Sequence, residues 1–330
     1  MKTIGILTSG GDAPGMNAMI WAAVKACNSR GMKVYGIKNG FQGLLDKEVF
    51  ELTPESVEGI LDLGGTKLGT ARCQAMYSEE GRDEAAQAVR EWGMEGIIVG
   101  GGDGSFMGAR CLSERGIPTV GIPCTIDNDL GYTDNTIGFD TACNTATDAI
   151  MKVRDTMMSH NRVAVVEVMG RHCGDIALTV GLVAGADYIL IPEIQYETQF
   201  DFEKLAKHLK TLKDQKQRSG LVVIAEGVEY DVKMRAYVLR DRLKEATDLD
   251  IKVSVLGHMQ RGGYPTVRDR RYAMQMTDRA VQLLYRNIGN RVVGIKNNRI
   301  IDMDIMEAAE IKKTLNVDLY NLALNLGSSK

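Results

Sequence analysis

A short segment that contains a threonine and two aspartates carries the strongest signal for catalysis. Thr125, Asp127 and Asp129 alternate within Pro123–Asp129, and residues two apart in an extended loop face the same side. Two carboxylates so close repel each other unless a metal, a proton or a base separates their roles, as a general base beside a Mg²⁺ ligand would. An Asx-type turn with solvated acids is the structural alternative. The apolar run Thr119–Ile122 leads straight into this loop and favours the catalytic interpretation.

Two glycine-rich segments follow apolar runs and could hold phosphate. In Thr8–Asn17 the glycines let backbone N–H groups approach an anion, and a following helix N-terminus favours negative charge. In Gly100–Ser105 three glycines precede Asp103, whose carboxylate could hold Mg²⁺ directly or through water. A tight strand-to-helix turn explains the first segment about equally well, and the second is neither a Walker A sequence nor a Rossmann fingerprint. The coupling of glycines to Asp103 favours a phosphate or metal role for the second.

Two further segments place a cation or an imidazole beside glycine. They are Glu167–Asp175 and Gly257–Gly263, and each follows an apolar run. Basic groups that donate hydrogen bonds beside flexible backbone suit a sugar phosphate. The structural alternatives remain open, because His258 could be a hydrogen-bonded structural histidine and the flanking methionines are typical of packing.

The elements that would position these residues alternate along the chain. Apolar runs of buried-strand type end in glycine or a charged residue, at 4–7, 96–99, 163–168 and 221–225. Amphipathic stretches that predict helices lie between them, at 16–29, 81–92, 106–115, 141–160, 202–213 and 270–286. This alternation predicts a parallel sheet covered on both faces, where ligands bind beyond the carboxyl ends of the strands. The glycines and charges described above all follow such strands.

Length and composition favour two α/β domains in a cytoplasmic protein. The 330 residues exceed one small core, and a net charge of −3 gives no general attraction to nucleic acid or membrane. An anionic substrate must therefore be held by local basic groups. No apolar run reaches the length of a membrane span, and the apolar stretch at the N-terminus is too short for a signal peptide. The six cysteines show neither paired nor zinc-ligand spacing, which indicates reduced thiols.

The motifs together resemble the bacterial-type ATP-dependent 6-phosphofructokinases, the phosphofructokinase type A family. The resemblance runs from residue 2 to about residue 298 and keeps the order and spacing of T-S-G-G-D-A-P-G-M-N, G-G-D-G-S, T-I-D-N-D, T-I-G-F-D-T-A, E-V-M-G-R and G-H-M-Q-R-G-G. It implies two Rossmann-like three-layer α/β domains with mainly parallel sheets and an active site in the cleft between them. Residues 1–138 with about 260–310 would bind ATP. Residues 139–259 with about 311–330 would bind fructose 6-phosphate.

The resemblance also implies roles for single residues. The nucleotide would contact Gly11, Arg72, Cys73, Gly102, Asp103, Gly104 and Ser105, with Asp103 serving Mg²⁺ and Phe41 standing where the family often has a tyrosine near the adenine. Fructose 6-phosphate would contact Thr125, Ile126, Asp127, Arg162, Met169, Gly170, Arg171, Glu226, Lys252, His258, Met259, Gln260 and Arg261. Arg162 and Lys252 would reach the 6-phosphate from a neighbouring subunit of a homotetramer. The catalytic set would be Thr125, Asp127, Asp129 and Arg171, with Asp127 as general base and with Arg171, Arg72 and Mg²⁺ stabilising the transferred phosphoryl group.

Three alternatives to ATP-dependent phosphorylation of fructose 6-phosphate remain. In the pyrophosphate-dependent branch of the family, aspartate is typical at the position of Gly104 and lysine at that of Cys124; the usual ATP-branch residue at the latter is glycine. Gly104 therefore favours ATP, and Cys124 departs from both patterns. A kinase for another ketose phosphate, such as tagatose 6-phosphate, is the second alternative. A non-catalytic sugar-phosphate sensor is the third, against which the joint presence of Asp103, Asp127, Asp129 and Arg171 argues.

Departures from the family pattern concern sugar binding and regulation. Lys252 replaces an arginine, which predicts weaker fructose 6-phosphate binding than the family norm. Regulated relatives bind ADP and phosphoenolpyruvate in a cluster of basic residues, which here is depleted. Trp21, Lys25 and Pro54 replace arginines, Gly59 replaces an aspartate and Asp187 a glutamate, whereas Arg154 remains. An apparent four-residue insertion before 210–219 leaves Lys213, Lys216 and Arg218 unmatched. We expect weak or lost control by these effectors, unless Trp21 merely packs in a helix face and neighbouring lysines rebuild the cluster.

Overall fold

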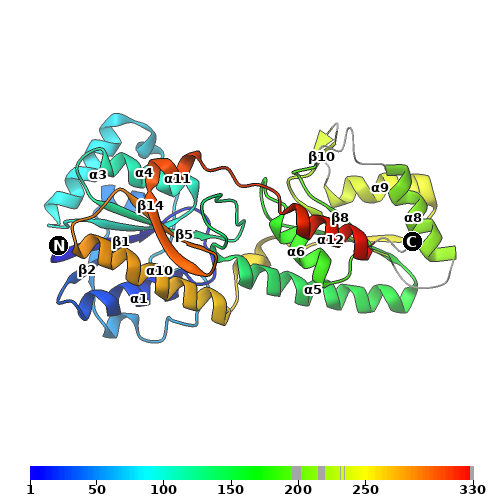
Figure 1. The fold of residues 1–330 in the computed structure, drawn as a ribbon, viewed down its shortest axis with the longest axis horizontal. Helices are drawn as coiled ribbons and strands as arrows, with labels where there is room; N and C mark the ends of the chain where they lie inside the picture. The colour runs from blue at the N-terminus through cyan, green and yellow to red at the C-terminus, as the bar shows by residue number, and fades with distance from the viewer. Residues whose placement is uncertain (195–201, 215–219, 231, 234, 328–330) are drawn as a thin grey trace. The chain divides into compact units, whose positions relative to one another are not determined.

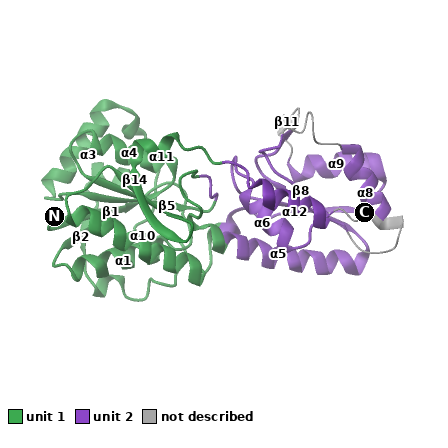
Figure 2. Cartoon of the chain, viewed as in Figure 1, with its two compact units in different colours: residues 1–126, 130–141, 261–313 green, residues 127–129, 142–260, 314–330 purple. Residues whose placement is uncertain are grey.

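The computed structural model describes residues 1–194, 202–214, 220–230, 232–233 and 235–327. The chain divides into two compact units (Figure 2). Unit 1 comprises residues 1–126, 130–141 and 261–313, and unit 2 comprises residues 127–129, 142–260 and 314–330. The expected division, at 138 and about 260, placed residues 127–129 in the first domain, whereas here they belong to unit 2. Lys216 and Arg218 lie outside the described residues.

Unit 1 is built on an eight-stranded, mainly parallel sheet. The strand order is β14-β13-β5-β4-β1-β2-β3, and the short β6 pairs with β5. The strands are β1 (Thr3–Thr8), β2 (Lys33–Ile37), β3 (Val49–Leu52), β4 (Ile97–Gly101), β5 (Thr119–Thr125), β6 (Ile137–Gly138), β13 (Arg291–Lys296) and β14 (Arg299–Asp304). β3 and β14 run antiparallel to their neighbours, and the strands between them are parallel. The carboxyl ends of β1, β4 and β5 therefore meet at one edge of the sheet.

Helices cover both faces of this sheet (Figure 1). They are α1 (Met16–Asn28), α2 (Phe41–Leu45), α3 (Glu79–Glu91), α4 (Asp103–Ser113), α10 (Val267–Tyr285) and α11 (Ile305–Glu310), with 3-10 turns η1 (Glu55–Val57) and η2 (Gln74–Tyr77). α1 and α10 lie on one face, and α3, α4 and α11 on the other. Fully buried Leu7, Val99 and Val292 of the sheet pack against Ala85 and Phe106 of the second helix layer. The apolar runs form strands because both of their faces are buried in this way.

Unit 2 has a smaller, wholly parallel sheet in the order β12-β7-β9-β8. Its strands are β7 (Val163–Val168), β8 (Tyr188–Leu190), β9 (Leu221–Ala225) and β12 (Ile251–Val255), beside a short hairpin of β10 (Glu229–Tyr230) and β11 (Val232–Lys233). The helices are α5 (Phe139–His160, whose first three residues belong to unit 1), α6 (Asp175–Val183), α8 (Phe202–Asp214), α9 (Ala236–Thr247) and α12 (Val317–Gly327), with the 3-10 turn η3 (Gly257–Arg261). β7 and β9 are buried along their whole length, as continuous apolar runs predict.

One buried carboxylate fixes the first turn of α5 to α10. Asp269 is 1% exposed, and its Oδ2 accepts hydrogen bonds from the backbone N–H (2.8 Å) and the hydroxyl (2.5 Å) of Thr141. Its Oδ1 is buried and has no hydrogen-bond partner among the described residues. Burial raises the pKa of Asp269 to about 6, although the hydrogen bonds from Thr141 act to lower that pKa. Thr266 caps α10, since its hydroxyl accepts from the Asp269 N–H at 3.2 Å.

The two-unit α/β architecture with mainly parallel sheets is confirmed. Two helices begin three residues earlier than predicted: α4 at Asp103 rather than Phe106, and α10 at Val267 rather than Arg270. Gly102 is the N-cap of α4, so the glycine-rich segment ends inside the first helical turn instead of forming a separate loop. Within the described residues, no helix combines the length and the apolar character that a membrane span requires.

Candidate active site

In unit 1, the loop after β1 is held against a second segment, residues 63–70. The Asn17 side chain is 4% exposed, donates to the carbonyls of Leu63 (3.2 Å) and Gly64 (3.0 Å), and accepts from the Lys67 N–H at 2.6 Å. The Thr70 hydroxyl donates to the Gly10 carbonyl at 2.6 Å. These bonds position the stretch that leads into Arg72. Asn17 was not among the predicted site residues, although it ends the motif T-S-G-G-D-A-P-G-M-N.

Gly11 lies beneath the guanidinium of Arg261. A Cβ built on Gly11 would lie 2.5 Å from Arg261 Nη1, so a larger residue there would displace this guanidinium. The same Nη1 donates to the Asp12 carbonyl at 3.1 Å. The structure thereby brings together a predicted nucleotide residue and a predicted sugar-phosphate residue within unit 1.

The start of α4 lies beside the ends of β1 and β5. Asp103 and Gly104 are exposed, and a Cβ built on Gly104 would meet no atom within 4 Å. Ser105 is buried, and a Cβ built on Gly102 would lie 3.8 Å from the Cβ of Thr125, the last residue of β5. A helix N-terminus with free space and exposed backbone N–H groups can bind the phosphates of a nucleotide.

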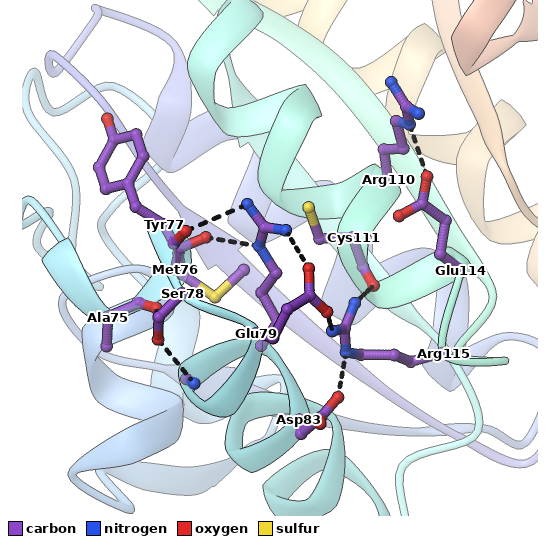
Figure 3. Close-up of polar contacts among 12 residues, drawn as sticks. Ala75, Met76, Tyr77, Ser78, Glu79, Asp83, Arg110, Cys111, Glu114 and Arg115 are labelled. Carbon is purple, nitrogen blue, oxygen red and sulfur yellow. Dashed lines mark hydrogen bonds and ion pairs between the residues drawn. The ribbon is translucent and has the colours of Figure 1, made fainter.

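Arg72 and Cys73 precede η2, which is tied to α3 and α4 by a network of polar contacts (Figure 3). Arg82 Nε donates to the Met76 carbonyl at 2.8 Å, and its Nη1 pairs with Glu79 at 2.8 Å. Glu79 also pairs with Arg115, which reaches Asp83 at 2.6 Å. Arg72 itself is exposed, while Cys73 packs against the apolar core. The network therefore fixes the backbone next to an accessible guanidinium.

Two residues near the predicted nucleotide site are packing residues in the structure. Phe41 is 5% exposed, and its ring approaches Gly108 of α4 so closely that a Cβ there would lie 2.6 Å away. Cys124 is 1% exposed, and its Sγ lies 3.6 Å from Met19 Sδ. Burial raises the pKa of the Cys124 thiol well above its ordinary value, so it stays neutral.

In unit 2, the carboxyl ends of β7 and β9 gather the sugar-phosphate candidates. Gly170 and Arg171 both have positive φ angles, of 139° and 56°. The Arg171 N–H donates to Glu226 Oε1 at 2.9 Å, and the Arg171 carbonyl lies where a Cβ on Gly227 would stand. Arg171 as a whole is exposed. The backbone is thus held tightly while the charged side chain is left available to a ligand.

The turn η3 contributes further sugar-phosphate candidates next to the end of β7. Gln260 is fully buried; its Oε1 accepts from the Met169 N–H at 3.3 Å and its Nε2 donates to the Gly257 carbonyl at 3.0 Å. His258 and Met259 are both exposed. Gln260 is therefore a positioning residue that joins η3 to the end of β7, and its two more accessible neighbours are the ones that could contact a ligand.

The loop that carries the two aspartates is not extended throughout, which corrects the premise of the sequence prediction. Thr125 ends β5 and Ile126 is fully buried, but Asn128 adopts a left-handed conformation with φ 52°. Asp127 and Asp129 were expected to face the same side because side chains alternate along an extended loop. The left-handed backbone at Asn128 breaks that alternation. Asp127 is 7% exposed. Asp129 is half-buried, and its Oδ1 has no hydrogen-bond partner among the described residues.

Arg162 and Lys252 lie away from the other sugar-phosphate candidates. Arg162 immediately precedes β7, whereas Met169 immediately follows it, and six strand residues span about 20 Å. Lys252 is the second residue of β12, which pairs with β7 in parallel. Asp250 joins the two cations, at 2.6 Å from Arg162 Nε and 2.8 Å from Lys252 Nζ. Within one chain these cations cannot share a ligand with Met169.

The residues fit a magnesium ion that is held jointly with phosphate. No group of three or more histidine, cysteine or acidic side chains that could hold a metal occurs among the described residues. Mg²⁺ does not need such a cage, because it usually keeps several waters and binds one or two carboxylates together with substrate phosphates. Asp103 offers an exposed carboxylate at the open start of α4.

Comparison with known proteins places this geometry in a family. A family model described as phosphofructokinase matches residues 3–284. The chain is 50% identical to the ATP-dependent 6-phosphofructokinase of Clostridium botulinum strain Hall, over 98% of each chain. A structure of phosphofructokinase from Saccharomyces cerevisiae superimposes with a TM-score of 0.89 at 33% identity, over 99% of this chain and 48% of the yeast chain, so the chain spans about half the yeast chain's length. A pyrophosphate-dependent phosphofructokinase from Marinobacter aquaeolei, 22% identical, has the same fold with a TM-score of 0.86 over 100% of this chain and 92% of the other.

Proposed function

Because the chain belongs to the phosphofructokinase family, we propose that it transfers the γ-phosphoryl group of ATP to the 1-hydroxyl of fructose 6-phosphate, with Asp127 as general base. The activity is that of an ATP-dependent 6-phosphofructokinase, which forms fructose 1,6-bisphosphate in the committed step of glycolysis. One observation carries it: the chain is half identical to an ATP-dependent enzyme over 98% of both chains.

The donor is bound by unit 1 in this proposal. The start of α4, in Gly102–Ser105, offers a helix N-terminus to the phosphates, and Gly11 allows close approach at the β1 loop. Arg72 and Cys73 complete the nucleotide contacts. Asp103 would hold the Mg²⁺, which, when bound, supplies positive charge to the phosphate oxygens.

The acceptor is assigned to residues of unit 2; Thr125, Ile126 and Arg261, which the family pattern also assigns to the sugar phosphate, belong to unit 1. Met169, Gly170 and Arg171 follow β7, Glu226 follows β9, and His258, Met259 and Gln260 form η3. Their backbone is fixed by the bonds of Arg171 to Glu226 and of Gln260 to Met169. Such fixed groups hold the sugar so that its reacting hydroxyl is in place before transfer.

The chemical step requires a base and stabilisation of charge. Asp127 would accept the proton of the sugar 1-hydroxyl as that oxygen attacks the γ-phosphorus, while Arg171 and Arg72 stabilise the transferred group. Thr125 and Asp129 flank the base and complete the catalytic set. Phosphoryl transfer depends mainly on in-line positioning and charge stabilisation, and a positioned base contributes about 10²- to 10⁴-fold.

Two features of unit 1 favour ATP over pyrophosphate as donor. Gly104 faces open space and adds no carboxylate beside Asp103. Cys124 is a buried neutral thiol packed on Met19, so it supplies no cation for a pyrophosphate. The experiment below distinguishes this activity from phosphorylation of tagatose 6-phosphate and from a sensor that binds the sugar phosphate without turnover.

Assembly as a homotetramer is also proposed, and the place of two cations supports it. Arg162 and Lys252 stand at the amino ends of β7 and β12, about one strand length from Met169. We therefore assign them to the 6-phosphate bound by a neighbouring copy. No nucleic acid or membrane partner is proposed, and the enzyme is assigned to the cytoplasm, where its substrates are.

Loss of control by ADP and phosphoenolpyruvate is also proposed. Arg154 Nη1 donates to the Ala184 carbonyl at 2.9 Å, and buried Asp187 accepts from the Leu221 N–H at 2.8 Å. Lys25 Nζ lies 5.8 Å from the ring centroid of Trp21. Arg154 Nη1 and the replacement residues Asp187 and Lys25 thus already contact groups of the same chain.

The test compares wild type with Asp127→Asn. We expect wild type to use ATP with fructose 6-phosphate far better than pyrophosphate or tagatose 6-phosphate, by kcat/KM. Asp127→Asn keeps the shape and removes the base, so kcat should fall by about 10² or more while both KM values change little. Wild-type turnover by a folded Asp127→Asn variant would exclude Asp127 as the base. Absence of turnover with tight fructose 6-phosphate binding in wild type would indicate a sensor.

A further inference from the structure

The proposed base stands in an unusual part of the chain. Residues 127–129 belong to unit 2, although the residues before and after them belong to unit 1. The middle residue, Asn128, is 3% exposed and has a φ of 52°. Left-handed backbone is unfavourable for most residues and is best tolerated by glycine, asparagine and aspartate. A buried residue in this conformation needs contacts that hold it there.

Those contacts come from the segment that begins α6. Asn128 Nδ2 donates to Asp175 Oδ2 at 2.8 Å, and the Asn128 carbonyl accepts a weak bond from the Cys173 thiol at 3.9 Å. Asp175 is in the first turn of α6, where a carboxylate is favoured by the helix dipole. The side chain and the backbone of Asn128 are therefore both held by one short segment.

The same segment also carries Arg171. The Cys173 N–H donates to the Gly170 carbonyl at 2.8 Å, and the Gly174 N–H donates to Glu193 Oε1 at 2.6 Å. Residues 170–175 thus form a fixed turn with Arg171 at one end and the anchor of Asn128 at the other. Whatever holds Asn128 also sets the place of Asp127 relative to Arg171 and Glu226, to which the Arg171 N–H is bonded.

We propose that Asn128 is the positioning residue of the base: its left-handed backbone and its amide bond to Asp175 set the carboxylate of Asp127 on the frame that holds the sugar phosphate. This inference rests on the proposed role of Asp127. Asn128 touches no reacting atom and acts through its neighbour. Since a general base must lie within hydrogen-bond reach of the hydroxyl, a small displacement lowers turnover more than it lowers binding.

The test distinguishes the effect of losing the Asn128 amide from the effect of straining the Asn128 backbone. Asn128→Gly keeps the left-handed φ at low cost and removes the amide, whereas Asn128→Ala also makes the backbone strained. Asp175→Ala removes the anchor and leaves Asn128 in place. Asn298→Gly is the matched control, because Asn298 is also left-handed (φ 60°) but lies in an exposed turn.

We expect Asn128→Gly and Asp175→Ala each to lower kcat by about 10- to 100-fold, the effect of losing a charge-assisted hydrogen bond. KM for ATP should stay within about threefold, and the double variant should be no slower than the slower single variant, because both remove one interaction. Asn128→Ala should be slower and less thermostable than Asn128→Gly. Asn298→Gly should match wild type.

A folded Asn128→Gly variant with kcat within about twofold of wild type would overturn the inference, even if its melting temperature fell. Additive losses in the double variant would also overturn it. If Asn128→Gly does not fold, Asp175→Ala, which removes the acceptor and leaves Asn128 in place, decides by the same kcat criterion. Full turnover by Asp127→Asn would instead refute the proposed function with Asp127 as base. That result is measured on a different variant, so the two failures can be told apart.

Discussion

At the scale of single residues, the position after Asp103 tests the choice of donor. A side chain at Gly104 enters open space in the first turn of α4, and no left-handed backbone restricts it. Gly104→Ala should therefore leave kcat/KM for ATP within about threefold. Gly104→Asp should raise KM for ATP at least tenfold, because a second carboxylate beside Asp103 repels phosphate by about 1–4 kcal/mol near a protein surface. Steady-state kinetics with ATP and with pyrophosphate check this, and equal behaviour of the two variants would contradict a phosphate site at α4.

Lys252 offers a second test at this scale. Its ion pair with Asp250 joins two side chains that are 46% and 48% exposed, so the pair contributes little to stability. Lysine is a point donor, whereas arginine presents a planar fork to phosphate. We expect Lys252→Arg to lower KM for fructose 6-phosphate about two- to tenfold without a change in kcat. A raised or unchanged KM, measured on a variant whose assembly state matches wild type, would show that Lys252 does not bind the 6-phosphate.

At the scale of elements, the junction of α5 and α10 predicts a pH dependence of stability. The pKa of Asp269 is about 6 in the folded chain, above its ordinary value of 3.8. The folded state therefore holds more protons between these values, and the free energy of unfolding falls as pH rises through this range and levels off above about 6. A gap of about two pH units corresponds to about 3 kcal/mol.

The variant Asp269→Asn should remove this dependence. Urea unfolding from pH 4 to pH 8 should give a variant-minus-wild-type difference that rises by about 2–3 kcal/mol up to pH 6–7 and then stays constant. Thr266→Ala is the control, because loss of the α10 cap should cost about 0.5–2 kcal/mol without that rise. A flat difference for Asp269→Asn would mean that the carboxylate is not perturbed in the folded chain.

Elements with buried apolar runs could be predicted from the sequence, and those fixed by distant contacts could not. β7 and β9 were predicted with both ends, because their burial on two faces leaves a continuous apolar run. The helical start at Asp103 was missed because glycine is a poor helix former and the segment resembles a loop. The hairpin of β13 and β14 was also missed, although its left-handed turn residues, Asn297 and Asn298, are a hairpin signal.

The same distinction applies to the site. The types of residue in Gly102–Ser105 and Thr125–Asp129 suggested phosphate binding and a base, since carboxylates and glycines have few other uses after a buried strand. The conformation of Asn128 could not be predicted, because its partner Asp175 is 47 residues away in the sequence. Asn17 was missed for the same reason, as its partners lie in a later loop.

At the scale of the whole molecule, the proposed loss of effector control can be tested directly. Allostery requires a ligand that discriminates between two states. Arg154, which remains of the cluster, donates through Nη1 to a backbone carbonyl, and Asp187, which replaces a glutamate, accepts from a backbone N–H. Fructose 6-phosphate titrations at fixed Mg-ATP should therefore have the same half-saturation with and without millimolar phosphoenolpyruvate or ADP. Varying ATP separates product inhibition by ADP. A large shift in half-saturation that ATP cannot reverse would show that an effector site remains.

The distance between Arg162 and Met169 has a consequence for inheritance. If each 6-phosphate is bound by cations from another copy, then no single chain carries all the residues of one site. A cell that makes two differently damaged versions, one lacking the base and one lacking the cations, would rebuild some intact sites in mixed assemblies. Conversely, one faulty version would disable sites that belong to healthy chains. Damage at the amino ends of β7 and β12 would thus impair a site carried by another chain, although those residues lie about one strand length from the proposed sugar site at the other end of β7.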